Sequence, residues 1–228
     1  EVGFIVTYIC DNGFLKFTNV GGVDSKVACG RAVSVGENAV KEVKEEAGLD
    51  VQAKQMIAAG FKDITLLGQN VNSYGKNDDH GVDFAKLLRM LNDIDGDFQL
   101  RFMTSHPKDC TLELLDAMAE CDKVCKHLHL PFQSGNDRVL SEMNRHYDRA
   151  HYLSLIKAAR ERMPDISITS DVIVGFPGET GEEFAATCAF LKEICFYEIH
   201  VFRYSRRNGT AAAKMPDQIP EDIKQRRQ

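Results

Sequence analysis

Apolar and polar residues alternate with two different periods along this chain. Short segments rich in β-branched and aromatic residues predict strands at residues 3–9, 62–67, 98–103, 126–130, 167–174 and 198–203. Between them, apolar residues three and four positions apart predict helices. An alternation of strands and helices requires parallel strands joined by right-handed crossovers. The sequence therefore predicts an α/β fold.

Three of the predicted helices carry distinct signals. Asp83 precedes the first apolar stripe, and Thr180 with Glu183 forms a capping box at the start of the third helix. The residues expected to face the core are Phe84, Leu87, Leu88 and Leu91 in the first helix, Tyr152, Leu155, Ile156, Ala159 and Met163 in the second, and Phe184, Cys188, Leu191 and Cys195 in the third.

Polar residues follow the predicted strands, at 68–70, 104–106, 131–135 and 175–179. Both open doubly wound sheets and barrels place functional residues at these carboxyl ends. The first crossover contains neither a Gly-x-Gly-x-x-Gly nor a Walker sequence, which disfavours an open nucleotide-binding sheet. We therefore expect a partial (β/α)6 barrel with parallel strands over residues 1–214, and a C-terminal segment over residues 215–228.

Composition favours an ordinary globular protein in a reducing compartment. The chain has 228 residues, of which 43% are hydrophobic and 27% charged, and no apolar run approaches the length of a membrane span. Its seven cysteines are odd in number and irregularly spaced, unlike a secreted disulfide framework. We expect a location in the cytoplasm, with the mitochondrial matrix as the alternative, and neither a membrane nor a secreted partner.

The charge is unevenly distributed. The net charge of −6 argues against a surface that grips nucleic acid everywhere. From residue 203 onward, however, seven Lys or Arg stand against three acidic residues. This basic end is either a solvated terminal segment or a surface that meets phosphate.

Four sequence blocks point to a family. Residues 66–74, 127–135, 143–145 and 174–180, in this order, resemble the radical S-adenosylmethionine methylthiotransferases. The Gln-Asn-Val-Asn-Ser loop at 69–73 is similar to the branch that methylthiolates isopentenylated adenosine beside the tRNA anticodon. The resemblance implies an enzyme, a radical-SAM type of partial barrel and a [4Fe–4S] cluster held by three cysteines after the first strand.

The resemblance also assigns cofactor contacts. Gln69 and Asn70 would lie near the methionine portion and the ribose of S-adenosylmethionine, and Ser134 would hydrogen-bond the cofactor. Arg145 would pair with its carboxylate, as a planar bidentate donor can. The residues expected to face the ribose and adenine are Asp171, Gly175, Phe176 and Pro177. Asp171 could instead cap a neighbouring backbone, and Arg145 could complement a helix dipole.

The cluster loop departs from the family pattern. Cys10 aligns with the first ligand and is the only family ligand kept, because Phe14 and Phe17 stand where the second and third cysteines belong. Three explanations are open: a relative that has lost its cluster, a damaged gene segment, or unfamiliar ligation by Cys10, Cys29 and a third donor. The alternative function is therefore an inactive relative that at most binds S-adenosylmethionine or RNA. The family's small RNA-binding β-domain normally follows the segment around residue 220, and we expect it to be absent here. We therefore expect weak tRNA binding.

Overall fold

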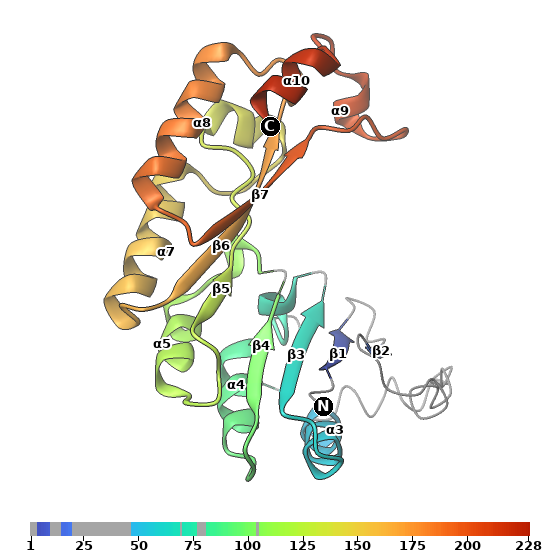
Figure 1. The fold of residues 1–228 in the computed structure, drawn as a ribbon, viewed down its shortest axis with the longest axis vertical. Helices are drawn as coiled ribbons and strands as arrows, with labels where there is room; N and C mark the ends of the chain where they lie inside the picture. Colours follow the sequence, from blue (N-terminus) through green and yellow to red (C-terminus); the bar gives the residue numbers. More distant parts are fainter. Residues whose placement is uncertain (1–3, 10–14, 20–46, 69, 77–80, 104) are drawn as a thin grey trace. The chain divides into compact units, whose positions relative to one another are not determined.

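The computed structural model describes residues 4–9, 15–19, 47–68, 70–76, 81–103 and 105–228 (Figure 1). For residues 4–9, 15–19, 47–52, 67 and 68 it describes the backbone alone. The chain divides into two compact units, Glu1–Leu128 and His129–Gln228, and each is described by itself.

The first unit contains a four-stranded sheet in the order β2-β1-β3-β4. Strand β3 pairs in parallel with both β1 and β4, whereas β2 pairs antiparallel with β1. The strands are β1 (Phe4–Ile9), β2 (Leu15–Asn19), β3 (Asp63–Gly68) and β4 (Gln99–Phe102). The helices are α3 (Ala47–Ala58), η1 (Val71–Ser73), α4 (Phe84–Asn92), η2 (Pro107–Asp109) and α5 (Leu112–Glu120).

Helix α4 supplies much of the apolar core of this unit. Asp83 caps its N-terminus by accepting a hydrogen bond of 2.8 Å from the Lys86 backbone N–H, which satisfies one of the unpaired donors of the first turn. The ring of Phe84 meets the ring of Phe102 on β4 edge to face, with centroids 5.1 Å apart. All four residues predicted to face the core are buried, so the helix and its orientation are confirmed.

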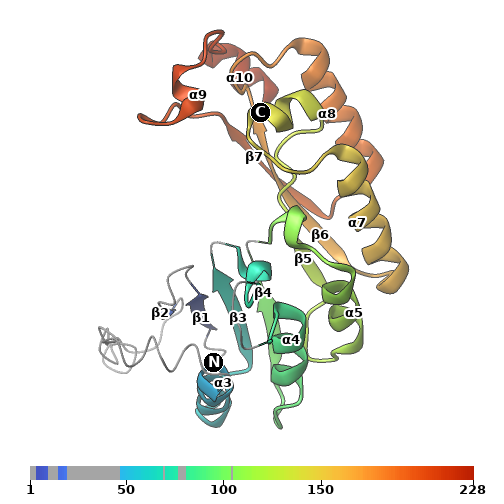
Figure 2. The same ribbon diagram turned by 180° about the vertical axis from the view of Figure 1, so that it is seen from behind.

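The second unit contains a three-stranded sheet in the order β5-β6-β7, in which β6 and β7 are parallel. Figures 1 and 2 both show α7 and α8 along the same side of this sheet. The strands are β5 (His127–His129), β6 (Ser167–Val174) and β7 (Glu198–Arg203). The helices are α6 (Asp137–Glu142), α7 (Arg149–Arg162), α8 (Gly181–Ile194), α9 (Ala211–Lys214) and α10 (Glu221–Arg227).

An aromatic cluster forms the centre of this second core. The ring of Phe132 lies 5.6 Å from that of Tyr152 on α7 and 5.4 Å from that of Phe190 on α8. The Tyr152 hydroxyl, buried with its ring, donates a hydrogen bond of 2.7 Å to the Leu130 carbonyl. These rings pack both helices against the segment that follows β5.

The predicted buried face of α8 is wrong, although its start is confirmed. The capping box of Thr180 and Glu183 is present in both directions. The buried residues of α8 are instead Thr187, Phe190 and Ile194. This face is buried because the Phe190 ring packs in the aromatic cluster. The residues predicted to face inward, Phe184, Cys188, Leu191 and Cys195, are half-buried or, for Cys195, exposed.

The α/β class with parallel strands is confirmed, and β6 and β7 have the predicted bounds. The strands of the described residues form two sheets, and these residues form no closed barrel. Strand β2 was not expected from the sequence. No helix among the described residues combines the length and apolar character needed to cross a membrane.

Candidate functional site

A buried histidine and a partly exposed carboxylate face each other on β5 and β6. His129 Nδ1 lies 3.0 Å from Thr169 Oγ1, and His129 Nε2 lies 3.6 Å from Asp171 Oδ2. The Asp171 side chain keeps 26% of its surface exposed, against 8% for His129. Burial lowers the pKa of His129, and the Asp171 carboxylate opposes that shift. His129 is therefore neutral at neutral pH, while Asp171 remains accessible to a ligand.

The turn after β5 is tied to β6 by its backbone. Gln133 has a φ of +71°, its N–H donates to the Asp171 carbonyl at 2.9 Å, and its carbonyl accepts from the Ile173 N–H at 2.9 Å. Ser134 is fully buried, and its hydroxyl oxygen accepts a hydrogen bond of 3.3 Å from the Asn136 N–H. The predicted cofactor contact of Ser134 stays a prediction, and in this structure the hydroxyl shapes the turn.

The same turn is pressed against α8. A Cβ atom added to Gly135 would lie 2.7 Å from Thr187 Cα and 2.9 Å from Phe190 Cβ, closer than such atoms approach. The Gly135 N–H donates to Thr187 Oγ1 at 3.1 Å. Glycine is therefore required here by the close approach of the helix, and the helix in turn fixes the position of the turn.

Arg145 is oriented by the C-terminal cap of α6. Asn144 adopts the left-handed conformation, with a φ of +58°; after glycine, Asn is a residue often found in this conformation at helix ends. The Arg145 N–H then donates to the Leu140 carbonyl at 2.9 Å. Burial raises the pKa of Tyr147 to about 12, and the Arg145 guanidinium opposes this shift from nearby. The Arg145 Nε is buried without a hydrogen-bond partner among the described residues.

The turn after β6, residues 175–179, is also buried. Gly175 has a φ of +73°, and a Cβ atom there would collide with Lys224 Cγ. Phe176 packs edge to face on Tyr204, with ring centroids 5.4 Å apart, and Pro177 is buried beside it. These three predicted cofactor residues therefore have contacts within the chain, and their contact with a cofactor stays a prediction.

The polar loop after β3 lies in the first unit. Gln69 falls outside the described residues, and Asn70 precedes η1 without making a side-chain capping bond. Asn72 is buried and bridges to the backbone of His106, donating to its carbonyl and accepting from its N–H, both at 2.9 Å. Part of this motif therefore holds two strand-end loops of the first unit together.

Ser73 and Lys76 extend this connection by binding Asp109. The Ser73 hydroxyl donates to Asp109 Oδ2 at 2.5 Å, and the Lys76 ammonium forms an ion pair with the other carboxylate oxygen. Burial raises the pKa of Asp109, but the hydrogen bonds from Lys76 and Ser73 outweigh it and the net shift is downward. The Asp109 carboxylate thus remains charged while it anchors the loop.

The predicted site residues therefore fall into two sets. Asn70 lies in the first unit, whereas the second unit contains Ser134, Arg145, Asp171 and the turn at residues 175–179. Within the second set, the backbone of Gln133 links the Ser134 turn directly to Asp171.

The predicted cluster loop lies mostly outside the described residues, including Cys10 and Phe14. Phe17 is described as backbone in β2, where it is paired with Thr7 of β1. The position that should supply a third thiolate is thus part of an antiparallel strand pair. Among the described residues, no three His, Cys, Asp or Glu side chains are grouped as a metal site requires.

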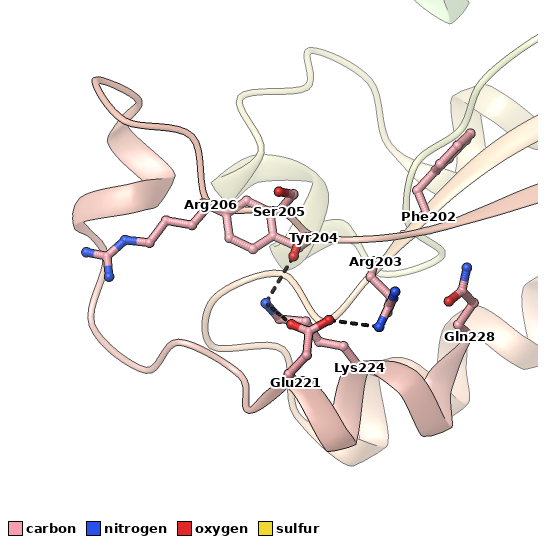
Figure 3. Close-up of a pocket in the computed structure, with 8 residues that line it drawn as sticks. All are labelled: Phe202, Arg203, Tyr204, Ser205, Arg206, Glu221, Lys224 and Gln228. Atoms are coloured by element: carbon pink, nitrogen blue, oxygen red, sulfur yellow. Dashed lines mark hydrogen bonds and ion pairs between the residues drawn. The ribbon is translucent and has the colours of Figure 1, made fainter.

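An open pocket of about 470 Å³ lies at the carboxyl end of β7. Figure 3 shows Lys224 directed toward Tyr204 and Glu221, while Arg206 points away from these residues. The lining residues are Phe202, Arg203, Tyr204, Ser205, Arg206, Glu221, Lys224 and Gln228. None of the predicted cofactor residues lines this pocket.

Sequence reasoning missed the side chains that hold the turn at residues 175–179. Arg138 on α6 donates to the Gly178 carbonyl at 2.9 Å, and the Asp217 carbonyl accepts from the Gly178 N–H at 2.9 Å. Arg227 on α10 pairs with Glu179 at 2.5 Å. The last pair spans 48 residues, so no local pattern could indicate it. Lys224 and Arg227 are largely buried, so the interpretation of this end as a solvated segment fails for these two residues. It holds for the other five basic residues, which are exposed.

Comparison with known proteins identifies similar sequences. The family profile described as the Radical SAM superfamily matches residues 29–191. A protein of Alkaliphilus oremlandii, named tRNA-2-methylthio-N(6)-dimethylallyladenosine synthase, is 54% identical over 184 residues, which cover 81% of this chain and 39% of that protein. A Clostridium botulinum protein of the same name, from strain Alaska E43, is 52% identical over 77% of this chain and 39% of its own length. The chain thus spans about two fifths of these relatives.

A solved structure shares the fold. Coproporphyrinogen III oxidase (HemN) from Escherichia coli matches 81% of this chain and 44% of its own chain with a TM-score of 0.59 and 20% sequence identity. At this identity the likeness concerns the fold alone. It agrees with the α/β class and the parallel strands described above.

We predict that Gly175→Ala destabilises the second unit more than Gly178→Ala does. Both glycines have a positive φ, and alanine in that conformation costs roughly 1–2 kcal/mol. Only at Gly175 does the new Cβ also collide with Lys224, which adds about 1–3 kcal/mol. Urea denaturation of the two variants measures the difference. Equal losses would show that Lys224 does not pack against Gly175.

We also predict that His129 titrates below its ordinary pKa of about 6.5. The lowered pKa means that the unfolded chain binds more protons than the folded chain, so His129 costs stability as the pH falls below about 6.5. Asp171→Asn should lower the pKa of His129 further, because it removes the opposing carboxylate. NMR titration of the imidazole tests both statements, and an upward shift in the variant would contradict the pairing.

Proposed function

Because the chain belongs to the radical SAM superfamily, we propose that it forms the S-adenosylmethionine-binding part of a tRNA methylthiotransferase. The proposed reaction places a methylthio group on isopentenylated adenosine beside the anticodon. The observation that carries the proposal is the identity of about half of all aligned residues to relatives named for this product. Since the chain spans 39% of those relatives, the activity, tRNA as partner and a location in the cytoplasm are proposed for the whole protein.

The chemistry of the proposed product requires more than side chains. An aromatic C–H is too weakly acidic for an ordinary side-chain base, so no acid–base group of this chain could break that bond by removing the proton. S-adenosylmethionine bound beside a [4Fe–4S] cluster supplies both a methyl group and a radical in this family. The contribution of this chain's residues is to bind and orient the cofactor and to exclude water from it.

The second unit contains residues that fit S-adenosylmethionine. The buried Nε of Arg145 has no partner among the described residues, and a carboxylate oxygen of the methionine portion would satisfy it. Asp171 is partly exposed within β6, where its carboxylate could accept hydrogen bonds from ribose hydroxyls. The backbone of Gln133 would hold Asp171 and the Ser134 turn in one arrangement. These contacts support cofactor binding by the second unit.

The first crossover does not fit a cluster. Three thiolates are needed to hold a cuboidal cluster with one open iron, and residues 10–17 contain Cys10 alone. In addition, the backbone at Phe17 is part of strand β2, where it is paired with Thr7 of β1. This observation favours a second candidate function, in which the chain binds S-adenosylmethionine but forms no radical. Any contact of the basic C-terminal end with tRNA would be weak and salt-sensitive.

Restoring the missing thiols separates the two candidates. We predict that the chain, after anaerobic incubation with iron and sulfide, holds well below about four irons, and that Phe14→Cys/Phe17→Cys raises the content toward four. Iron analysis and visible charge-transfer absorption report the result. Adding Cys10→Ala to the double variant is the control and should remove the gain. About four irons in the unaltered chain would instead favour the catalytic function with unfamiliar ligands.

Cofactor binding can be tested without the cluster. We predict that Arg145→Lys weakens the binding of S-adenosylmethionine by about tenfold, because a single ammonium cannot replace a planar bidentate donor. Isothermal calorimetry measures the affinity. Arg160→Lys is the control. Arg160 lies in the last turn of α7, and its bond within the described part of the chain is to the Cys195 carbonyl, at 3.0 Å. Equal affinity in both variants would remove Arg145 from the site.

A further inference from the structure

We infer that Arg227 is a positioning residue, which acts through Glu179 to fix the backbone of the turn at residues 175–179. The inference extends the proposed function, on which it rests for the identity of the ligand. It makes helix α10 part of the architecture of the cofactor site.

The Glu179 carboxylate links the two ends of the turn to α10. Its side chain is 1% exposed, and its Oε2 accepts hydrogen bonds from the Gly175 N–H at 2.7 Å and from Arg227 Nη1 at 2.5 Å. A single oxygen therefore joins Gly175, the first residue of the turn, to Arg227, which lies 48 residues beyond Glu179 in the sequence. Displacing Arg227 would remove one of the two hydrogen bonds that fix the oxygen to which Gly175 donates.

Arg227 grips the end of the turn twice. Besides the carboxylate, its Nη1 donates to the Glu179 carbonyl at 3.1 Å. The guanidinium lies over the ring of Phe184 on α8, with 5.3 Å between its carbon and the ring centroid, and the side chain is 12% exposed. The guanidinium is thus itself fixed by α8, so that it can serve as a rigid support.

The electrostatics make Glu179 depend on Arg227. Burial raises the pKa of Glu179, which disfavours its charged form, while the Gly175 N–H and Arg227 lower it. Glu183 on α8 also faces Glu179 and raises the pKa further. The Glu179 charge also raises the pKa of Arg138 on α6, but the hydrogen bonds of Arg138 go to the Glu183 carboxylate and the Gly178 carbonyl. Arg227 is therefore the cation in direct contact with the Glu179 carboxylate among the described residues.

The rest of the C-terminal segment closes over the same turn. The stem of Lys224 occupies the space beside Gly175, and its ammonium donates to the Tyr204 carbonyl at 3.0 Å (Figure 3). The Asp217 carbonyl accepts from the Gly178 N–H at 2.9 Å. With Glu179 bound to Arg227, the segment contacts the beginning, the middle and the end of the turn.

The test compares Arg227→Met with Arg226→Met in the full chain. Arg226 is the matched control, because it lies in the same helix and its ion-pair partner among the residues that the structure describes is Asp222, at the exposed surface. Hydrogen exchange of the Gly175 amide and calorimetry with S-adenosylmethionine are measured in both. We expect about tenfold or faster exchange at Gly175, and about tenfold weaker binding, in Arg227→Met alone. Amides of β7 should exchange as before, whereas loss of a purely structural anchor would accelerate them too.

A second variant covers the case in which Arg227→Met does not fold. Arg227→Met/Glu179→Gln removes the buried charge together with its partner, and is expected to fold but still to bind the cofactor about tenfold more weakly. Gly175 exchange and cofactor affinity equal to those of the unaltered chain, in either folded variant, would overturn the inference. If Gly175 exchanges faster in Arg227→Met but even the unaltered chain binds no S-adenosylmethionine, the role of Arg227 in fixing the turn is supported. The proposed function is then overturned instead.

Discussion

Backbone polar groups at the ends of parallel strands lose their ladder partners, and every turn at such an edge must satisfy them in another way. This chain does so with side chains, two of which come from distant parts of the same unit, while the third, Glu179, belongs to the turn itself. Asn72 bonds both backbone groups of His106, Thr187 accepts from Gly135, and Glu179 accepts from Gly175. The strand-end turns are therefore not independent loops. Each is positioned by an element that follows or precedes it by many residues.

This requirement explains which parts of the structure could be predicted from the sequence. The apolar stripe after Asp83, the capping box at Thr180 and the bounds of β6 depend on neighbouring residues, and all three are confirmed. The buried face of α8 depends instead on Phe132, far away in sequence, and was predicted wrongly. The helical spacing of apolar residues in α8 is compatible with two adjacent faces of the helix. The contact of Phe190 with the aromatic cluster determines which of them is buried.

The candidate site shows the same division. The turns after β5 and β6 were located correctly from their Gly, Pro and polar residues, but the partners that hold them were not. Strand β2 was missed because residues 14–17 were interpreted as a family loop that had lost its ligands. Leu15 and Phe17 alternate with Lys16 and Thr18, which is a strand pattern in its own right. The family motif at residues 10–17 indicates a loop, whereas the alternation of apolar and polar residues at 15–18 indicates a strand, and the alternation is the correct guide.

The close approach at Gly135 has a mechanical consequence. With Thr187 Cα only 2.7 Å from where a Cβ would stand, the turn and the inner face of α8 leave no clearance for relative sliding. The two must fluctuate as one body, so the amplitude of thermal motion at Ser134 is set by a fourteen-residue helix rather than by the turn itself. A short turn at the end of a strand thereby acquires the stiffness of a much larger element.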